Sequence, residues 1–123
     1  MKMLSIEAFV PSGSSFEKSR ELFQELGFHI NWESPGYAGF QRDECRFILQ
    51  DYNVQDFAKN FMLSVKLSDV DAFRKDILDK GLPQKYGIRV SNITKQPYGL
   101  ELNLIDIAGV CWHFVEQIEM ILQ

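Results

Sequence analysis

Two stretches of the chain resemble one another, and this internal repeat limits the folds that the sequence can adopt. They are SSFEKSRELFQELGF (14–28) and SDVDAFRKDILDKGL (68–82). In both, apolar residues recur at intervals of three and four, which predicts an amphipathic helix. Gly27 and Gly81 follow the helices, where a residue in the left-handed conformation commonly ends a helix. The sequence therefore predicts two equivalent halves, each built around one helix.

Both helices carry a capping signature at their start. Glu17 lies three positions after Ser14, and Asp71 lies three positions after Ser68. A serine hydroxyl accepts a hydrogen bond from a free N–H group of the first turn, and an acidic side chain there faces the positive end of the helix dipole. We therefore expect the helices to begin at these two serines.

Strand-like segments flank both helices in the same order. LSIEAFV (4–10) precedes the first helix and FMLSVKL (61–67) precedes the second. After the helices come short apolar runs separated by turns, at 28–33, 37–42, 45–52, 87–96, 99–106 and 110–115. Each half thus has the order β-α-β-β-β, which predicts an α+β fold. We expect a single domain of two tandem modules, at about 1–58 and 59–123.

The last two strands are predicted to form a hairpin. Leucine occupies every second position in the middle of 98–106, so that strand has one apolar face. DIAG (106–109) makes the turn. EQIEMILQ (116–123) is expected to add a final helical turn that docks through Ile118 and Ile121. Alternation in the last strand separates Trp112 and Phe114 from Cys111, His113 and Val115.

The composition argues against two classes of partner. The 123 residues suffice for one domain with a core, and the net charge of −4 with a pI near 5.1 opposes electrostatic binding of nucleic acid. No stretch approaches the ~20 apolar residues of a membrane span. Cys45 and Cys111 are the two cysteines, and no long apolar signal region opens the chain. We therefore expect a cytoplasmic protein with reduced thiols.

Three motifs carry a resemblance to a known family. Two β-α-β-β-β modules in a chain of this length resemble the vicinal oxygen chelate superfamily of glyoxalases, ring-cleaving dioxygenases and bleomycin-resistance proteins, and FQELGF (23–28) is similar to its first helix. YAGFQRDECRFIL (37–49) and QPYGLELNLIDIAGVCWHFVEQ (96–117) resemble the bleomycin-resistance branch. The second match contains Gln-Pro-aromatic-Gly, Asp-x-Ala-Gly and Cys-x-His-Phe-Val in order. The resemblance implies a homodimer whose subunits form two binding grooves between them.

The metal enzymes of this superfamily hold one divalent ion through side chains of the first and last strands of each module. The matching positions here fall at Ser5, Ile48, Met62 and His113, with Gln50 as an alternative to Ile48. A catalytic ion needs about three protein ligands, drawn from His, Gln or carboxylate side chains in this family. Because His113 alone is a good ligand, we expect no metal and no other cofactor.

The resemblance also indicates candidate ligand-binding residues. Three aromatic residues match positions near the groove of the bleomycin-resistance branch, where a flat ligand would stack on them. Glu101 shares a strand face with Asn103, and either that face looks into the groove or it faces solvent. The aromatic residues are equally compatible with core or dimer contacts. The predicted ligand-binding residues are Trp32, Tyr37, Ser64, Tyr98, Glu101 and His113.

Two features depart from the bleomycin-resistance branch. Ser64 stands where that branch carries a Trp, so one half of a stacking arrangement is missing. That branch is also more acidic than this chain, which suits it to a cationic drug. Both differences favour a related pocket over bleomycin itself.

Cys111 and His113 raise the question of nucleophilic catalysis. Their side chains leave the same strand face, with roots about 6–7 Å apart. A Cys–His nucleophile needs the base within hydrogen-bond reach of the sulfur, and a third group to orient that base. No third residue is evident from the sequence, so we interpret the pair as a small thiol beside a pocket-lining histidine and predict no catalytic residue.

Two hypotheses for the function follow. The first is a metal-independent protein that binds a small, partly aromatic molecule of the bleomycin type or an unknown metabolite. The alternative is a metal-dependent lyase or dioxygenase that uses an ion held partly by His113, which rests on analogy of fold alone.

Overall fold

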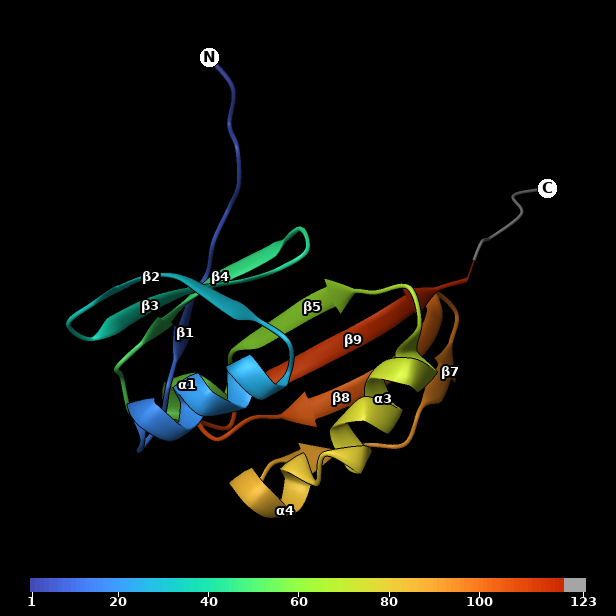
Figure 1. The fold of residues 1–123 in the computed structure, drawn as a ribbon. Coiled ribbons are helices and arrows are strands. Elements are labelled where there is room, and N and C mark those ends of the chain that lie inside the picture. Colours follow the sequence, from blue (N-terminus) through green and yellow to red (C-terminus); the bar gives the residue numbers. More distant parts are fainter. Residues whose placement is uncertain (119–123) are drawn as a thin grey trace.

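The computed structural model describes residues 1–118, and its first half has the expected β-α-β-β-β order (Figure 1). Four strands form sheet A in the order β1-β4-β3-β2, with β1 parallel to β4 and the other pairs antiparallel. The elements of this half are β1 (Phe9–Pro11), α1 (Phe16–Glu25), β2 (His29–Ser34), β3 (Tyr37–Arg42) and β4 (Cys45–Gln50).

The second half repeats this plan and forms sheet B, in the order β5-β9-β8-β6 with β7 also paired to β8. The expected single strand over 87–96 is instead two short strands. Between them, Ser91 stays hydrogen-bonded to Asn103: its N–H donates to the carbonyl of Asn103, and its hydroxyl accepts from the N–H of Asn103, both at 2.9 Å. The elements are α2 (Gln55–Lys59), β5 (Met62–Lys66), α3 (Val70–Asp79), α4 (Leu82–Tyr86), β6 (Arg89–Val90), β7 (Thr94–Gln96), β8 (Gly99–Ile105) and β9 (Cys111–Gln117).

Both long helices begin one residue later than predicted. The caps are Ser15, whose hydroxyl accepts from the N–H of Lys18, and Asp69, whose carboxylate accepts from the N–H of Ala72. Ser14 and Ser15 both carry an acceptor oxygen, and so do Ser68 and Asp69. The spacing to the acidic residue therefore could not decide which of the two neighbours caps each helix. The helix ends agree with the prediction, because Gly27 has φ +95° and Gly81 has φ +65°.

The two modules share one apolar core. Phe23 of α1 packs against Phe47 of sheet A, with ring centroids 4.8 Å apart, and against Trp112 of sheet B at 5.4 Å. The rings of Phe47 and Trp112 are themselves 5.2 Å apart. The buried faces of both sheets therefore meet each other directly, and each sheet keeps its other face away from this core. Further core residues include Leu22, Leu49, Val70, Ile77, Leu102, Leu104 and Phe114.

The first strand is much shorter than predicted. Instead of 4–10 it comprises Phe9–Pro11, because β1 pairs only with the last three residues of β4. The preceding residues form an extended arm that leaves the body of the protein (Figure 1). Met1, Met3, Leu4 and Ile6 are almost fully exposed along this arm.

The turn of the closing hairpin is organised by Asp106. One carboxylate oxygen accepts from the N–H groups of Ala108, Gly109 and Val110 at 3.0–3.1 Å. The other accepts from the indole N–H of Trp112 at 2.8 Å. The predicted turn at 106–109 is thus confirmed.

The end of the last strand differs from the prediction. Strand β9 continues to Gln117, so 116–117 are strand and not helix, and Ile118 is 42% exposed. Ile121 lies outside the described residues. Among residues 1–118, no helix has the length and apolar character needed to cross a bilayer.

Candidate functional site

The outward face of sheet B gathers most of the polar side chains that the sequence singled out. We call it the sheet B open face. In the ladder, Ser64 of β5 lies opposite His113 of β9, and His113 lies opposite Asn103 of β8. Because strand side chains alternate, this face is opposite to the core face of Trp112 and Phe114. Its members are Met62, Ser64, Lys66, Glu101, Asn103, Ile105, Cys111 and His113.

A hydrogen-bonded chain of side chains runs across this face. His113 Nε2 lies 3.4 Å from Cys111 Sγ, and His113 Nδ1 lies 3.3 Å from Glu101 Oε1. The hydroxyl of Tyr98 donates to the same Glu101 oxygen at 2.9 Å. Glu101 is only 7% exposed, so the alternative in which it faces solvent is wrong. That its face looks into a ligand groove stays a prediction.

This network affects two ionisable groups. Burial raises the pKa of the Cys111 thiol, and the negative charges of Glu101 and Asp106 raise it further. The hydrogen bond to Glu101 raises the pKa of Tyr98. Both groups therefore keep their protons at neutral pH.

Two other polar groups lie beside the network. Lys66 Nζ lies 3.4 Å from Ser64 Oγ, which brings a positive charge next to the ladder position of His113. Asn103 Oδ1 is buried and has no hydrogen-bond partner within residues 1–118. An unpaired buried acceptor is unfavourable for the folded protein.

The outward face of sheet A carries the other two predicted residues, and we call it the sheet A open face. Trp32 is 42% exposed and pairs with Gly39. Its indole lies across that glycine, since a Cβ there would be 2.0 Å from Trp32 Nε1. The ring of Tyr37 meets Phe9 edge to face, with centroids 6.1 Å apart. Gly39 therefore permits a half-exposed aromatic surface on this sheet.

The six predicted residues thus fall into two groups. Ser64, Tyr98, Glu101 and His113 lie together at the sheet B open face, whereas Trp32 and Tyr37 belong to the sheet A open face. Since the buried faces of the two sheets meet in the core, the two open faces of one chain point away from each other. The sequence missed the link between Cys111, His113 and Glu101, although the alternation in β8 and β9 already put all three on one face.

The residues that the sequence analysis matched to metal-binding positions are not gathered into a cluster of metal ligands. Ser5 lies in the exposed arm, and the side chains of Ile48 and Met62 offer no nitrogen or oxygen ligand. Within residues 1–118, no group of three or more His, Cys, Asp or Glu side chains is arranged to hold an ion. The donors present do not fit a divalent ion, which needs about three protein ligands.

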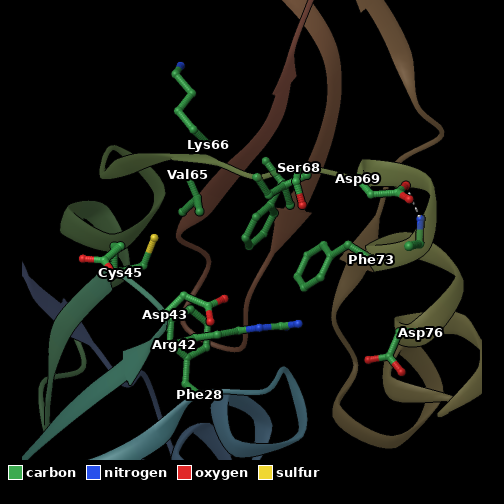
Figure 2. Close-up of a pocket in the computed structure, with 14 residues that line it drawn as sticks. Phe28, Arg42, Asp43, Cys45, Val65, Lys66, Ser68, Asp69, Phe73 and Asp76 are labelled. Carbon is green, nitrogen blue, oxygen red and sulfur yellow. Dashed lines mark hydrogen bonds between the residues drawn. The ribbon is translucent and has the colours of Figure 1, made fainter.

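A groove of about 440 Å³ lies elsewhere, between the β3–β4 turn and the start of α3 (Figure 2). Some of its polar groups are engaged within the protein: Arg42 donates to the carbonyl of Leu26, and Asp69 caps α3. Asp76 pairs with Lys80 at 3.0 Å. Figure 2 shows Arg42 extending along the groove toward Phe73, whose ring lies 5.7 Å from the guanidinium carbon. None of the six predicted residues lines this groove, so we assign the candidate site to the open faces.

Comparison with known proteins supports the fold. No protein-family model matches the sequence, and no curated protein matches it. Several solved structures match over nearly the whole chain. A bleomycin-binding protein from bleomycin-producing Streptomyces verticillus, complexed with copper(II)-bleomycin, has 20% identity and a TM-score of 0.77 over 96% of this chain and 99% of that one.

Two further structures extend this comparison. A bleomycin resistance determinant encoded on transposon Tn5 has 18% identity and a TM-score of 0.78, over 94% of this chain and 99% of that one. A glyoxalase family protein from Bacillus anthracis has 16% identity and a TM-score of 0.71, over 96% and 98%. The chain therefore has the α+β fold of these bleomycin-binding, bleomycin-resistance and glyoxalase family structures.

Proposed function

We propose that this protein binds a small, partly aromatic molecule without the help of a protein-held metal. The observation that carries the proposal is the exposed ring of Tyr98 beside the buried carboxylate of Glu101 at the sheet B open face, with a second exposed ring, Trp32, on the sheet A open face. Trp32 and Tyr98 are 42% and 47% exposed, whereas Glu101 is 7% exposed. Aromatic surfaces and a few oriented polar groups are the usual composition of small-molecule sites.

The polar groups define the ligand further. Glu101 and the unpaired Asn103 Oδ1 both accept hydrogen bonds, so the ligand should carry donors such as amide or amine N–H groups. A flat ring would stack on Trp32 or Tyr98, which contributes about 0.5–1.5 kcal/mol per pair beyond area burial. Two of the solved relatives are described as complexed with bleomycin, so bleomycin-type antibiotics are the first ligand class to test.

We further propose that the complete site forms in a homodimer. The two open faces of one chain point away from each other, so the aromatic group of sheet A meets the polar group of sheet B only when a second copy is present. The exposed arm, with Leu4 and Ile6, supplies apolar surface for that second copy. A symmetric pair of chains would then contain two equivalent sites.

Calorimetry with metal-free and copper-loaded bleomycin tests the drug assignment. We expect saturable binding to both forms, since the proposal does not require a metal held by the protein. Dissociation constants weaker than about 1 mM, or ΔG weaker than about −4 kcal/mol, would reject bleomycin as ligand. A panel of other partly aromatic amides then tests the broader proposal of small-molecule binding.

Truncation of the exposed rings should weaken binding. We expect Trp32→Ala and Tyr98→Ala each to raise the dissociation constant roughly tenfold, because one stacking contact and its buried area are lost. Phe57→Ala is the control, since Phe57 is also an exposed aromatic residue, at 46%, but lies in α2, where its ring packs against Tyr52 and Phe61, and is not on a strand of either sheet. Equal losses in all three variants would mean that binding does not involve the open faces.

Metal analysis separates this proposal from the enzyme alternative. Protein purified without chelator and then dialysed should contain far less than one equivalent of divalent ion, because only one good ligand is present among the expected positions. The alternative of a lyase or dioxygenase predicts near one equivalent, with activity that appears on adding Ni²⁺, Zn²⁺ or Fe²⁺ and disappears in His113→Ala.

A further inference from the structure

We propose that Cys111 is a nucleophile that adds covalently to soft carbon electrophiles of the α,β-unsaturated carbonyl class, with His113 as its base. Glu101 acts as a positioning residue that orients His113. This activity goes beyond reversible binding and does not depend on the identity of the ligand. It rests on three side chains joined in series on the sheet B open face, where sequence reasoning found only two.

The imidazole of His113 lies between the thiol and the carboxylate. Its Nδ1 is 3.3 Å from Glu101 Oε1, and its Nε2 is 3.4 Å from Cys111 Sγ. A carboxylate can only accept, so the ring proton belongs on Nδ1 and the lone pair of Nε2 faces the thiol. This is the order of groups in a Cys–His–acid arrangement, in which the base can remove the proton of the nucleophile.

The arrangement is held by rigid elements. Cys111 and His113 are two residues apart on β9, and Glu101 lies on the paired strand β8. The hydroxyl of Tyr98 holds the same Glu101 oxygen at 2.9 Å. Sites on paired strands keep their geometry better than sites on loops, so the imidazole is oriented before any electrophile arrives.

The surroundings explain why a base is needed and why the site is accessible. The pKa of the Cys111 thiol is raised by burial and by nearby carboxylates, so few thiolates form without help. The side chain of His113 is 27% exposed and Cys111 is partly exposed, so a small reagent can reach the sulfur. Cys45 is also a partly exposed free thiol, but within residues 1–118 it has no histidine partner.

The addition needs no oxidant and no leaving group. His113 Nε2 takes the proton of the thiol while the sulfur forms a bond to the β-carbon of the electrophile. The electrons of the carbon–carbon double bond move into the carbonyl as an enolate. The proton on Nε2 then passes to the α-carbon, which leaves a thioether at Cys111 and a neutral His113. All atoms of thiol and electrophile remain in the adduct.

Labelling with N-ethylmaleimide tests the proposal directly. The rate of adduct formation at each cysteine is measured at pH 7 by mass spectrometry of peptides from the folded protein. We expect Cys111 to react at least about tenfold faster than Cys45, since a positioned base accelerates proton transfer by roughly 10²–10⁴-fold. A Cys111 rate at or below that of Cys45 in the wild-type protein overturns the proposal.

Three variants identify the base. His113→Gln and His113→Ala should each slow labelling of Cys111 at least about tenfold. Added imidazole should restore the rate in His113→Ala, which a purely structural role of the ring would not allow. His29→Gln removes the other histidine, which lies in β2, and should leave the rate unchanged. Unchanged labelling in His113→Gln, or no rescue by imidazole, overturns the role of His113.

The positioning role of Glu101 has its own signature. Nitrogen-15 NMR of the histidine ring should show the Nδ1–H tautomer of His113 in the wild type. In Glu101→Gln it should show a larger share of the Nε2–H tautomer, together with slower labelling of Cys111. An unchanged tautomer with slower labelling would exclude Glu101 as the orienting group. Labelling without any ligand binding would support the nucleophile and reject only the proposed binding function, so the two can fail separately.

Discussion

Replacement of Asp106 by alanine is expected to lower the free energy of unfolding by about 3 kcal/mol or more, because several buried donors lose their acceptor at once. The carboxylate of Asp106 accepts from three backbone N–H groups of the hairpin turn and from the indole of Trp112. Trp112 is part of the shared core, so the loss should destabilise both modules. Denaturant unfolding measures this change.

The buried carboxyl group of Asp106 should also make the free energy of unfolding depend on pH. Burial raises the pKa of Asp106 to about 6, although its four hydrogen bonds act in the opposite direction. In the unfolded chain the pKa is about 3.9, so between the two values the folded protein holds a proton that the unfolded chain has released. The contribution of Asp106 to the free energy of unfolding should therefore fall as the pH rises from about 4 to about 6, by an amount on the order of 3 kcal/mol.

Two variants check this pH effect. Asp106→Asn cannot titrate, so it should remove the fall between about pH 4 and pH 6 while also weakening the bond to Trp112. Asp79→Asn is the control, because Asp79 pairs with Lys75 on the surface at 63% exposure and should change stability by less than about 0.5 kcal/mol. A stability profile that is the same in wild type and Asp106→Asn would contradict the raised pKa.

The variant Ile6→Asp is expected to convert the proposed homodimer into a monomer at micromolar concentrations. The side chain of Ile6 is 98% exposed in a single chain, so it has no packing partner there. Burying one large aliphatic side chain contributes about 1.5–3 kcal/mol, so its replacement by a charge should raise the dimer dissociation constant at least about tenfold. Light scattering after size exclusion measures the mass.

The matched control for this variant is Ser5→Asp, which adds the same charge at the neighbouring exposed position of the arm. It should leave the dimer intact. If the site needs both open faces, Ile6→Asp should also lose ligand binding while remaining folded. A wild-type protein that is monomeric over the whole concentration range would contradict the homodimer.

The repeat predicted the architecture well because it reports local structure. Apolar periodicity in 14–28 and 68–82 predicted both long helices, and Gly27 and Gly81 predicted their ends. The errors occur where local signals are ambiguous. Either neighbouring residue could cap each helix, and the apolar run at 4–10 gave no indication that β4 would pair with only three residues of β1. Pairing depends on a partner that is distant in the sequence.

The candidate site shows the same division. Alternation along β8 and β9 determined which side chains share a face, so His113 and Cys111 could be placed together from the sequence, as could Glu101 and Asn103. Alternation along each strand did not determine the distances between side chains of different strands, because these depend on the register of β8 against β9. That register brings Glu101 within 3.3 Å of His113 and turns a pair of side chains into a chain of three.

The sequence by itself determined two β-α-β-β-β modules, their helices and the faces of their strands, because periodicity and turn residues act over a few positions. Only the tertiary structure decided how the modules join. The aromatic contacts of Phe23, Phe47 and Trp112 bring the buried faces of the two sheets together. The open faces, with Trp32 on one and His113 on the other, consequently point apart. Packing between residues far apart in the chain, which no local pattern encodes, separated the two halves of the predicted site.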